Sequence, residues 1–79
     1  MHIPKIKSYS TQENIYQKHQ IVSDNISILD IFINSIAYRK LDYFQRKEVS
    51  QILVNQKKAL KNINEKIAEF EQLTFRFGS

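Results

Sequence analysis

Large apolar side chains recur at steps of three, four or seven residues along two stretches of the chain. Side chains at such steps stack on one face of an α-helix, whereas a half-buried strand alternates every second residue. The pattern therefore predicts two amphipathic helices joined by a turn. The first stripe consists of Ile15, Val22, Ile26, Leu29, Ile33 and Ile36, and the second of Val49, Leu53, Leu60, Ile63, Ile67 and Phe70.

The first helix has a start signal at Ser10. A hydroxyl at the cap and a carboxylate three residues later, here Glu13, match a capping box, in which each side chain bonds the other residue's backbone amide. This signal predicts a helix over about 11–38. The polar run at 23–25 could form a second cap and divide this helix, and a strand over 26–33 is a weaker alternative that its β-branched residues suggest.

The second helix has the same kind of start signal, with Asp42 as the cap and Gln45 three residues later. Good helix formers and the lack of internal Gly or Pro predict a helix over about 43–73. Because the connection between the helices is short, they should pack as an antiparallel hairpin. The predicted organisation is an irregular N-terminal arm at 1–9, a helical hairpin domain at 10–74 and an aromatic C-terminal tail at 75–79.

The charges suggest a register for this all-α hairpin. If facing residue numbers sum to about 82, cations of one helix lie opposite carboxylates of the other. Two polar side chains in the seam, His19 and Gln56, could fix register or oligomeric state. The charge pairs expected from this register are Asp24 with Lys57 and Lys58, Glu13 with Lys66, and Lys18 with Glu65.

The first helix has more apolar surface than one neighbouring helix can cover. Ile21, Ile28 and Phe32 form a second stripe beside the first, while Ile31 and Tyr38 point elsewhere. A helix that is apolar nearly all round is normally buried nearly all round. We therefore expect self-association, or docking onto another protein, to complete a bundle. The alternative is that the terminal segments, with Ile3, Ile6, Tyr9, Phe75 and Phe77, fold back over this helix.

The size of the chain supports the need for further contacts. At 79 residues it has no Cys for a disulfide, and its His, Asp and Glu residues lack metal-ligand spacing. A single core of this size rarely supplies more than about 3–5 kcal/mol of net stability. We expect no metal and no cofactor, and a homo-oligomer or another protein as partner.

No membrane segment is expected in the chain. The most apolar window, 26–37, is about half as long as a membrane span of roughly 20 residues and includes Asp30 and Asn34. The first residues contain no continuous apolar run of the kind found in secretory signals. These observations predict a cytoplasmic protein with no membrane partner.

Catalytic chemistry has little support in the sequence. The two imidazoles are His2 in the arm and His19, which lies one helical turn from Ser23 but in a pattern common by chance. Gly78 is the single Gly, so no phosphate-binding glycine loop is present. We expect neither an enzyme nor a small-molecule substrate.

Nucleic acid is an alternative partner, because the formal net charge is +4 and basic residues are spaced along the second helix and just before it. Apolar and small residues within 48–64 also match helix-turn-helix spacing, although Val54 stands where the turn usually has Gly. This second hypothesis describes a regulator with a degenerate helix-turn-helix. Its contacts would be Arg39, Lys40, Arg46, Lys47, Lys57, Lys58 and Lys61.

The sequence favours a small, basic, non-enzymatic helical module that binds another protein or itself, as an adaptor, an inhibitor or an assembly subunit. The apolar surplus of the first helix should be the contact, with aromatic contributors and a basic rim at the turn between the helices. The expected interface consists of Ile21, Ile28, Ile31, Phe32, Tyr38, Tyr43, Phe44, Arg39, Arg46 and Lys47.

Overall fold

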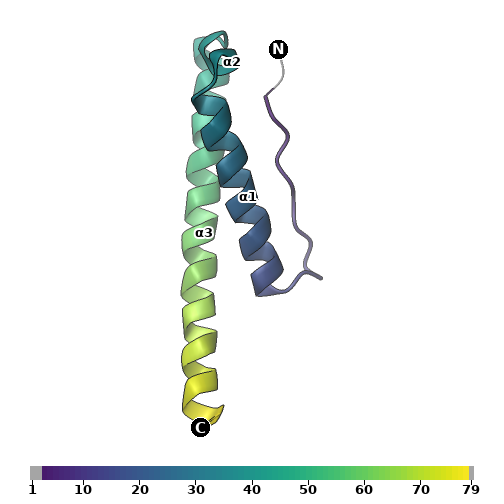
Figure 1. Ribbon diagram of the computed structural model, residues 1–79, viewed down its shortest axis with the longest axis vertical. Coiled ribbons are helices and arrows are strands. Elements are labelled where there is room, and N and C mark those ends of the chain that lie inside the picture. The colour runs from purple at the N-terminus through teal and green to yellow at the C-terminus, as the bar shows by residue number, and fades with distance from the viewer. Residues whose placement is uncertain (1–2, 79) are drawn as a thin grey trace.

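The computed structural model describes the backbone of residues 3–78 and the side chains of residues 3–73. The described chain is helical, and no strand occurs within it. Its extents are 55 × 19 × 17 Å, so the molecule is a narrow rod. Figure 1 shows the three helices, which are α1 (Ile15–Ile33), α2 (Ile36–Arg39) and α3 (Tyr43–Gly78).

The start of α1 differs from the sequence prediction. Asn14, rather than Ser10, is the N-cap: its side chain accepts a hydrogen bond from the Gln17 N–H at 2.9 Å, and the Gln17 side chain accepts one from the Asn14 N–H at 2.9 Å. The predicted start near residue 11 is therefore wrong. Ser10 forms a turn with Glu13 instead, through the Glu13 N–H and the Ser10 carbonyl at 3.3 Å. Two capping-box patterns follow each other directly in this segment, at 10–13 and 14–17, and the second one starts the helix.

The alternative of a break at 23–25 does not form, because α1 is continuous through these residues. The first helical stretch ends at Ile33 rather than near Tyr38, and α2 follows. Asn34 donates a side-chain hydrogen bond to the carbonyl of Asp30 at 2.9 Å, and the hydroxyl of Ser35 accepts one from the N–H of Tyr38 at 3.4 Å. Asn34 and Ser35 thus supply the local polar groups that end α1 and start α2.

The predicted start of α3 at Tyr43 is confirmed. The Asp42 side chain accepts from the Gln45 N–H at 2.8 Å, and the Gln45 side chain accepts from the Asp42 N–H at 3.2 Å. This capping box satisfies two amides that have no partner inside the helix. The helix extends beyond the expected end near 73, and the aromatic side chains predicted to form a tail at 75–79 lie outside the described residues.

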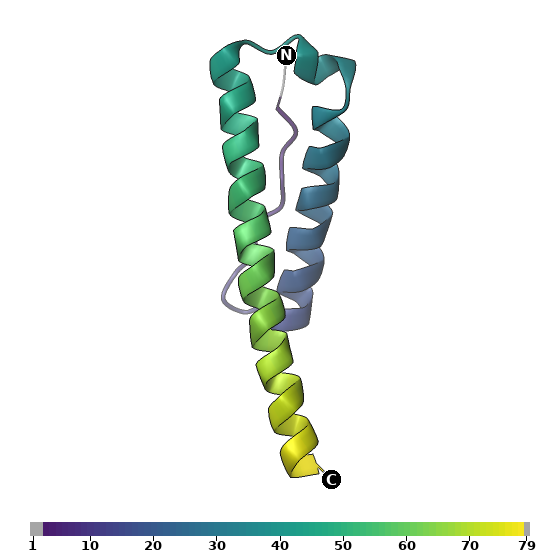
Figure 2. The same cartoon turned by 90° about the vertical axis from the view of Figure 1, so that its left-hand side faces the viewer.

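The helices α1 and α3 pack side by side and run in opposite directions, as Figures 1 and 2 show. The C-terminal part of α3 extends well beyond the start of α1 (Figure 2). The buried apolar side chains are few and lie along the contact between the helices and at their connection. They are Val22, Leu29, Leu41, Val49 and Ile63.

The charge pairs used to predict the register do not form. Among the residues with described side chains, none of the expected cation–carboxylate pairs is an ion pair. Asp24 instead accepts a hydrogen bond from Gln20 at 2.9 Å, and the Lys18 ammonium lies 5.6 Å from the centroid of the Tyr9 ring. The lysines on α3 and Glu65 are exposed, whereas Glu13, Lys18 and Asp24 are half-buried. An exposed ion pair contributes about 0–1 kcal/mol and does not determine geometry.

The N-terminal arm, residues 3–10, has no regular structure and lies along the helices (Figure 1). In Figure 2 it runs between the axes of α1 and α3. Ile3 and Ile6 pack against the core cluster around Leu29 and Val49. The arm therefore covers part of the apolar surface that the sequence assigned to a partner, as the alternative of a folded-back terminus expected.

Asn25 attaches this arm to both helices. Its side chain is 1% exposed. Its carbonyl accepts from the Lys7 N–H at 2.8 Å, and its amide donates to the Lys7 carbonyl at 2.8 Å and to the Gln56 side-chain carbonyl at 3.1 Å. The partners lie 18 and 31 residues away in sequence. One amide therefore joins the arm, α1 and α3, and we call this group the Asn25 clamp.

We expect Asn25→Ala to destabilise the protein by about 1–3 kcal/mol, because it leaves the part-buried hydrogen-bonding groups of the Lys7 backbone and the Gln56 side chain without their partner. Urea unfolding followed by circular dichroism measures this change. Asn64→Ala is the matched control, since Asn64 is an exposed Asn on α3. We expect this control to stay within about 0.5 kcal/mol of the parent protein. Equal effects of the two substitutions would contradict the clamp.

Candidate interaction surface

Exposed apolar side chains gather at one end of the rod. The four most exposed large apolar residues with described side chains are Phe44 at 78%, Ile31 at 73%, Ile36 at 70% and Tyr43 at 64%. All four lie within residues 31–44, where α1 ends, α2 forms and α3 begins. Scattered exposed apolar residues are normal on proteins, but a group of them at one end indicates a contact surface. We call these four residues the tip surface.

The fold of the connection explains why these side chains face outwards. Leu41 is 4% exposed and belongs to the core. Phe32 and Tyr38 pack against that core, and their rings meet edge to face with centroids 6.1 Å apart. These three side chains occupy the inward positions of the connection. Ile31 and Ile36 then remain on the outside.

Tyr43 and Phe44 are the first two residues of α3. Neighbouring helical residues point about 100° apart, so the two rings point in different directions. Both rings are exposed and contact each other edge to face, with centroids 5.6 Å apart and planes at 77°. The Asp42 and Gln45 capping box fixes the helix start that places them. The pair therefore forms a rigid aromatic edge on the tip.

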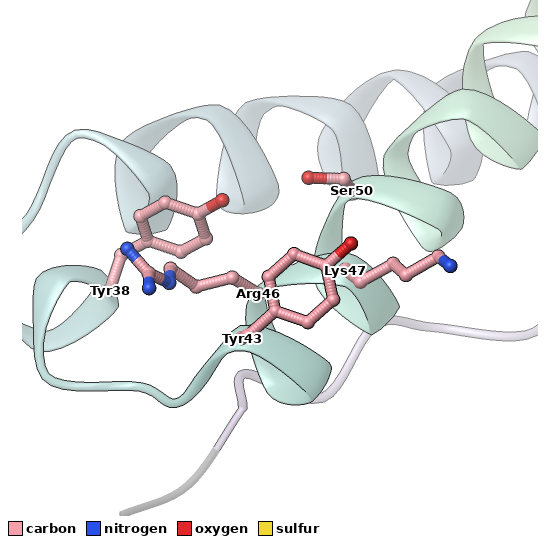
Figure 3. A pocket seen from close by; sticks show the side chains of 5 residues that line it. All are labelled: Tyr38, Tyr43, Arg46, Lys47 and Ser50. Atoms are coloured by element: carbon pink, nitrogen blue, oxygen red, sulfur yellow. The ribbon is translucent and has the colours of Figure 1, made fainter.

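A shallow hollow of about 340 Å³ adjoins this aromatic edge. Every side chain that lines it carries a hydrogen-bond donor, and none is acidic. In Figure 3 the hydroxyls of Tyr38 and Ser50 face each other across the hollow, while the Lys47 ammonium extends away from Tyr38. The hollow suits a small anionic or carbonyl-bearing group at its mouth. Its lining residues are Tyr38, Tyr43, Arg46, Lys47 and Ser50.

The structure brings together part of the interface expected from the sequence. Ile31, Tyr43 and Phe44 are exposed at the tip, and the expected rim residues Arg39, Arg46 and Lys47 are exposed as well. The remaining residues of the expected interface are half-buried by the fold itself, and their part in a contact through the side of α1 stays a prediction. Phe32 and Tyr38 pack on the core, and the arm lies on the α1 face beside Asn25. The half-buried residues are Ile21, Ile28, Phe32 and Tyr38.

Ile36 is the member of the surface that the sequence analysis missed. The heptad pattern placed it in the seam between the helices, whereas its side chain is 70% exposed. The break at Asn34 and Ser35 interrupts the helical phase, so a residue after the break no longer shares the face of Ile33. Two consecutive residues that favour helix ends are the sequence signal that could have shown this.

Basic residues lie along the outer side of α3. The alternative of a degenerate helix-turn-helix at 48–64 does not form, because α3 is continuous from Tyr43 to Gly78. Five exposed cations of α3 nevertheless share one side of the helix, since their positions fall within an arc of about 120° at 100° per residue. We call this set the basic strip: Arg46, Lys47, Lys57, Lys58 and Lys61.

The described residues contain neither a metal-binding group nor a membrane-spanning helix. The described part of the chain contains no group of three or more His, Cys, Asp or Glu residues that could hold a metal ion. Within the same part, no helix has the length and apolar character needed to cross a bilayer.

Comparison with known proteins gives no relative: no family model, curated protein or solved structure matches the chain. The tip surface and the basic strip are therefore the features of the molecule that indicate a function.

Two matched substitutions to Ala test which side chains near the tip are buried and which are exposed. We expect Leu41→Ala to destabilise the protein by about 2–5 kcal/mol, because Leu41 is buried. Ile36→Ala should change the free energy of unfolding by about 0.5 kcal/mol or less, because Ile36 already faces solvent. Thermal and urea unfolding of the two variants provide the measurement. A large loss for Ile36→Ala would place Ile36 in the core, as the heptad pattern predicted.

Proposed function

We propose that this protein is a non-enzymatic helical hairpin that binds another protein through its tip surface, as a small adaptor, inhibitor or assembly subunit. The observation that carries the proposal is the clustering of the four most exposed large apolar side chains at one end of the molecule. A solvated end of a rod has no structural need for two Ile, one Tyr and one Phe. Burial against a partner would remove this apolar area from water.

The composition of the tip resembles the centre of a protein interface. Aromatic residues and Arg are enriched where binding free energy concentrates, and a polar rim surrounds them. Tyr43 and Phe44 provide rigid aromatic area, and Ile31 and Ile36 provide aliphatic area beside it. The rim contains Arg39, which is exposed, together with the cations that line the hollow.

The charge of the rim favours a partner with an acidic surface. Arg46 and Lys47 flank the hollow, and Arg39 and Lys40 are exposed at the end of α2. Complementary charges raise the association rate and exclude partners of like charge more than they raise affinity. We therefore expect apolar contacts to determine the affinity and the basic rim to determine which partner is chosen.

The proposal can be tested on a binding partner isolated with the immobilised protein. We expect Ile31→Ser and Ile36→Ser together to weaken binding of that purified partner at least tenfold, which corresponds to about 1.4 kcal/mol. The loss follows from removing two exposed apolar side chains without disturbing the core. Isothermal titration calorimetry gives the dissociation constants, and circular dichroism checks that the variant is folded.

Val54→Ser is the control for this experiment, because Val54 is a half-exposed apolar residue of α3 outside the tip. Its affinity for the same partner should equal that of the parent protein. If the tip variant binds as tightly as the parent, or if the control loses as much affinity as the tip variant, the tip surface is not the binding site.

Binding of nucleic acid is a second candidate function, favoured by the single-sided basic strip. The strip begins beside the hollow at Arg46 and Lys47 and ends at Lys61, about four helical turns later. Glu48 falls on a different side of the helix, so it does not interrupt the strip. A row of exposed cations on one side of a helix is suited to contacts with a phosphate backbone.

Replacement of Lys57, Lys58 and Lys61 by Gln should weaken nucleic-acid binding and flatten its dependence on salt, because each lost phosphate contact lowers the slope by roughly 0.7–0.9. Fluorescence anisotropy with labelled single strands and duplexes at several salt concentrations measures both effects. The control removes three cations outside the strip, Lys5, Lys18 and Lys66. Absence of binding at low salt, or an equal effect of the control, would exclude the strip as a nucleic-acid site.

A further inference from the structure

On one side of α3, residues of related kinds lie at equal distances before and after position 57. Phe44 and Phe70 lie thirteen residues to either side of this position, and Glu48 and Lys66 lie nine residues to either side. These side chains fall within an arc of about 80° on the helix at 100° per residue. All four are exposed. The pattern thus places an aromatic residue at each end, with a carboxylate inside one end and an ammonium inside the other.

Residues between these ends continue the pattern with uncharged side chains. Ile52 pairs by number with Asn62, and Asn55 pairs with Ala59. Asn55 and Asn62 are exposed, whereas Ile52 and Ala59 are half-buried. Ala59 next to the centre would let another helix approach closely. None of the residues on this side between Glu48 and Lys66 is charged, so no like charges would meet there.

We infer that two copies of the chain form an antiparallel, two-fold symmetric dimer through this side of α3. In such a dimer, each contact occurs twice because the same surface of both copies is used. Phe44 of each copy meets Phe70 of the other, and Glu48 of each copy meets Lys66 of the other. A parallel arrangement would instead bring Glu48 against Glu48 and Lys66 against Lys66.

The length of α3 supports this arrangement. The helix α1 does not extend alongside the last turns of α3 (Figures 1 and 2). Phe70 is 55% exposed and Leu73 is exposed to a similar degree in those turns. An antiparallel second copy supplies the first turns of its own α3 at this level. The dimer therefore covers the part of α3 that the single chain leaves without a neighbouring helix.

The small core gives the dimer a physical reason. Five apolar side chains and one Asn are buried among the described residues, which is few for an independent domain. Contacts between Phe44 of one copy and Phe70 of the other would add apolar burial at both ends of α3. This inference goes beyond the proposed function and shares Phe44 with the tip surface. Variants of Glu48 and Lys66 test the dimer, whereas variants of Ile31 and Ile36 test binding by the tip.

Light scattering coupled to size exclusion tests the inference on the full chain. The expected mass is about twice the 9.4 kDa of the monomer at micromolar concentrations. Glu48→Lys alone and Lys66→Glu alone should each weaken association at least tenfold, because each creates two like-charge contacts. The double variant should regain the association of the parent protein, since both contacts are again between opposite charges.

Glu65→Lys is the matched control, because it reverses an exposed carboxylate of α3 on the side of the basic strip. It should leave the dimer unchanged, and circular dichroism should show that all variants are folded. A monomeric mass at every concentration would overturn the inference. A dimer that the single reversals do not weaken, or that the double variant does not restore, would overturn it as well.

Cysteine cross-linking gives a second measurement of the same arrangement, since the chain has no natural Cys. Glu48→Cys and Lys66→Cys should form a disulfide-linked dimer when the two variants are mixed. Either variant alone should stay unlinked, because residues 48 of the two copies lie far apart in an antiparallel pair. Efficient linking of Glu48→Cys to itself would show a parallel arrangement and overturn the inference.

Discussion

The side-chain amide of Asn25 is the interaction on which the remaining structure depends. A buried polar group costs free energy unless it is hydrogen-bonded, and this amide makes three hydrogen bonds in a fully buried position. Two of them pair with the backbone of Lys7 as a neighbouring strand would. The third joins α1 to Gln56 of α3. The clamp therefore fixes the position of the arm and the relative position of the two helices at the same level.

The clamp also determines which apolar residues face solvent. Ile21 and Ile28 lie four residues before and three residues after Asn25, on the same side of α1. These side chains are half-buried, and Ile3 and Ile6 of the arm reach the core. The apolar surplus that the sequence places along α1 is thus reduced, and the large exposed apolar group remains at the tip. The exposure of the tip residues themselves follows from the local packing of Leu41, Phe32 and Tyr38 and from the helix break at Asn34 and Ser35.

Features that depend on local contacts could be predicted from the sequence. The helical periodicity and the start of α3 at Asp42 rest on contacts within four residues. The start of α1 was missed because two capping-box patterns follow each other, at 10–13 and 14–17, and the second one caps the helix. The role of Asn25 was missed for a stronger reason. Its partners are 18 and 31 residues away, so its local pattern suggested a cap that the structure does not form.

The polar clamp affects stability and specificity in opposite directions. An apolar residue at position 25 would avoid the cost of burying an amide, but it would leave the Lys7 backbone and Gln56 without their partner. The hydrogen bonds of the Asn25 amide form with only one position of the arm and one facing residue of α3. Apolar contacts alone tolerate small shifts along the helices. A core with few buried apolar side chains and a polar centre is specific rather than strongly stable. The contacts proposed at the tip and along α3 would therefore add free energy of folding that the single chain lacks.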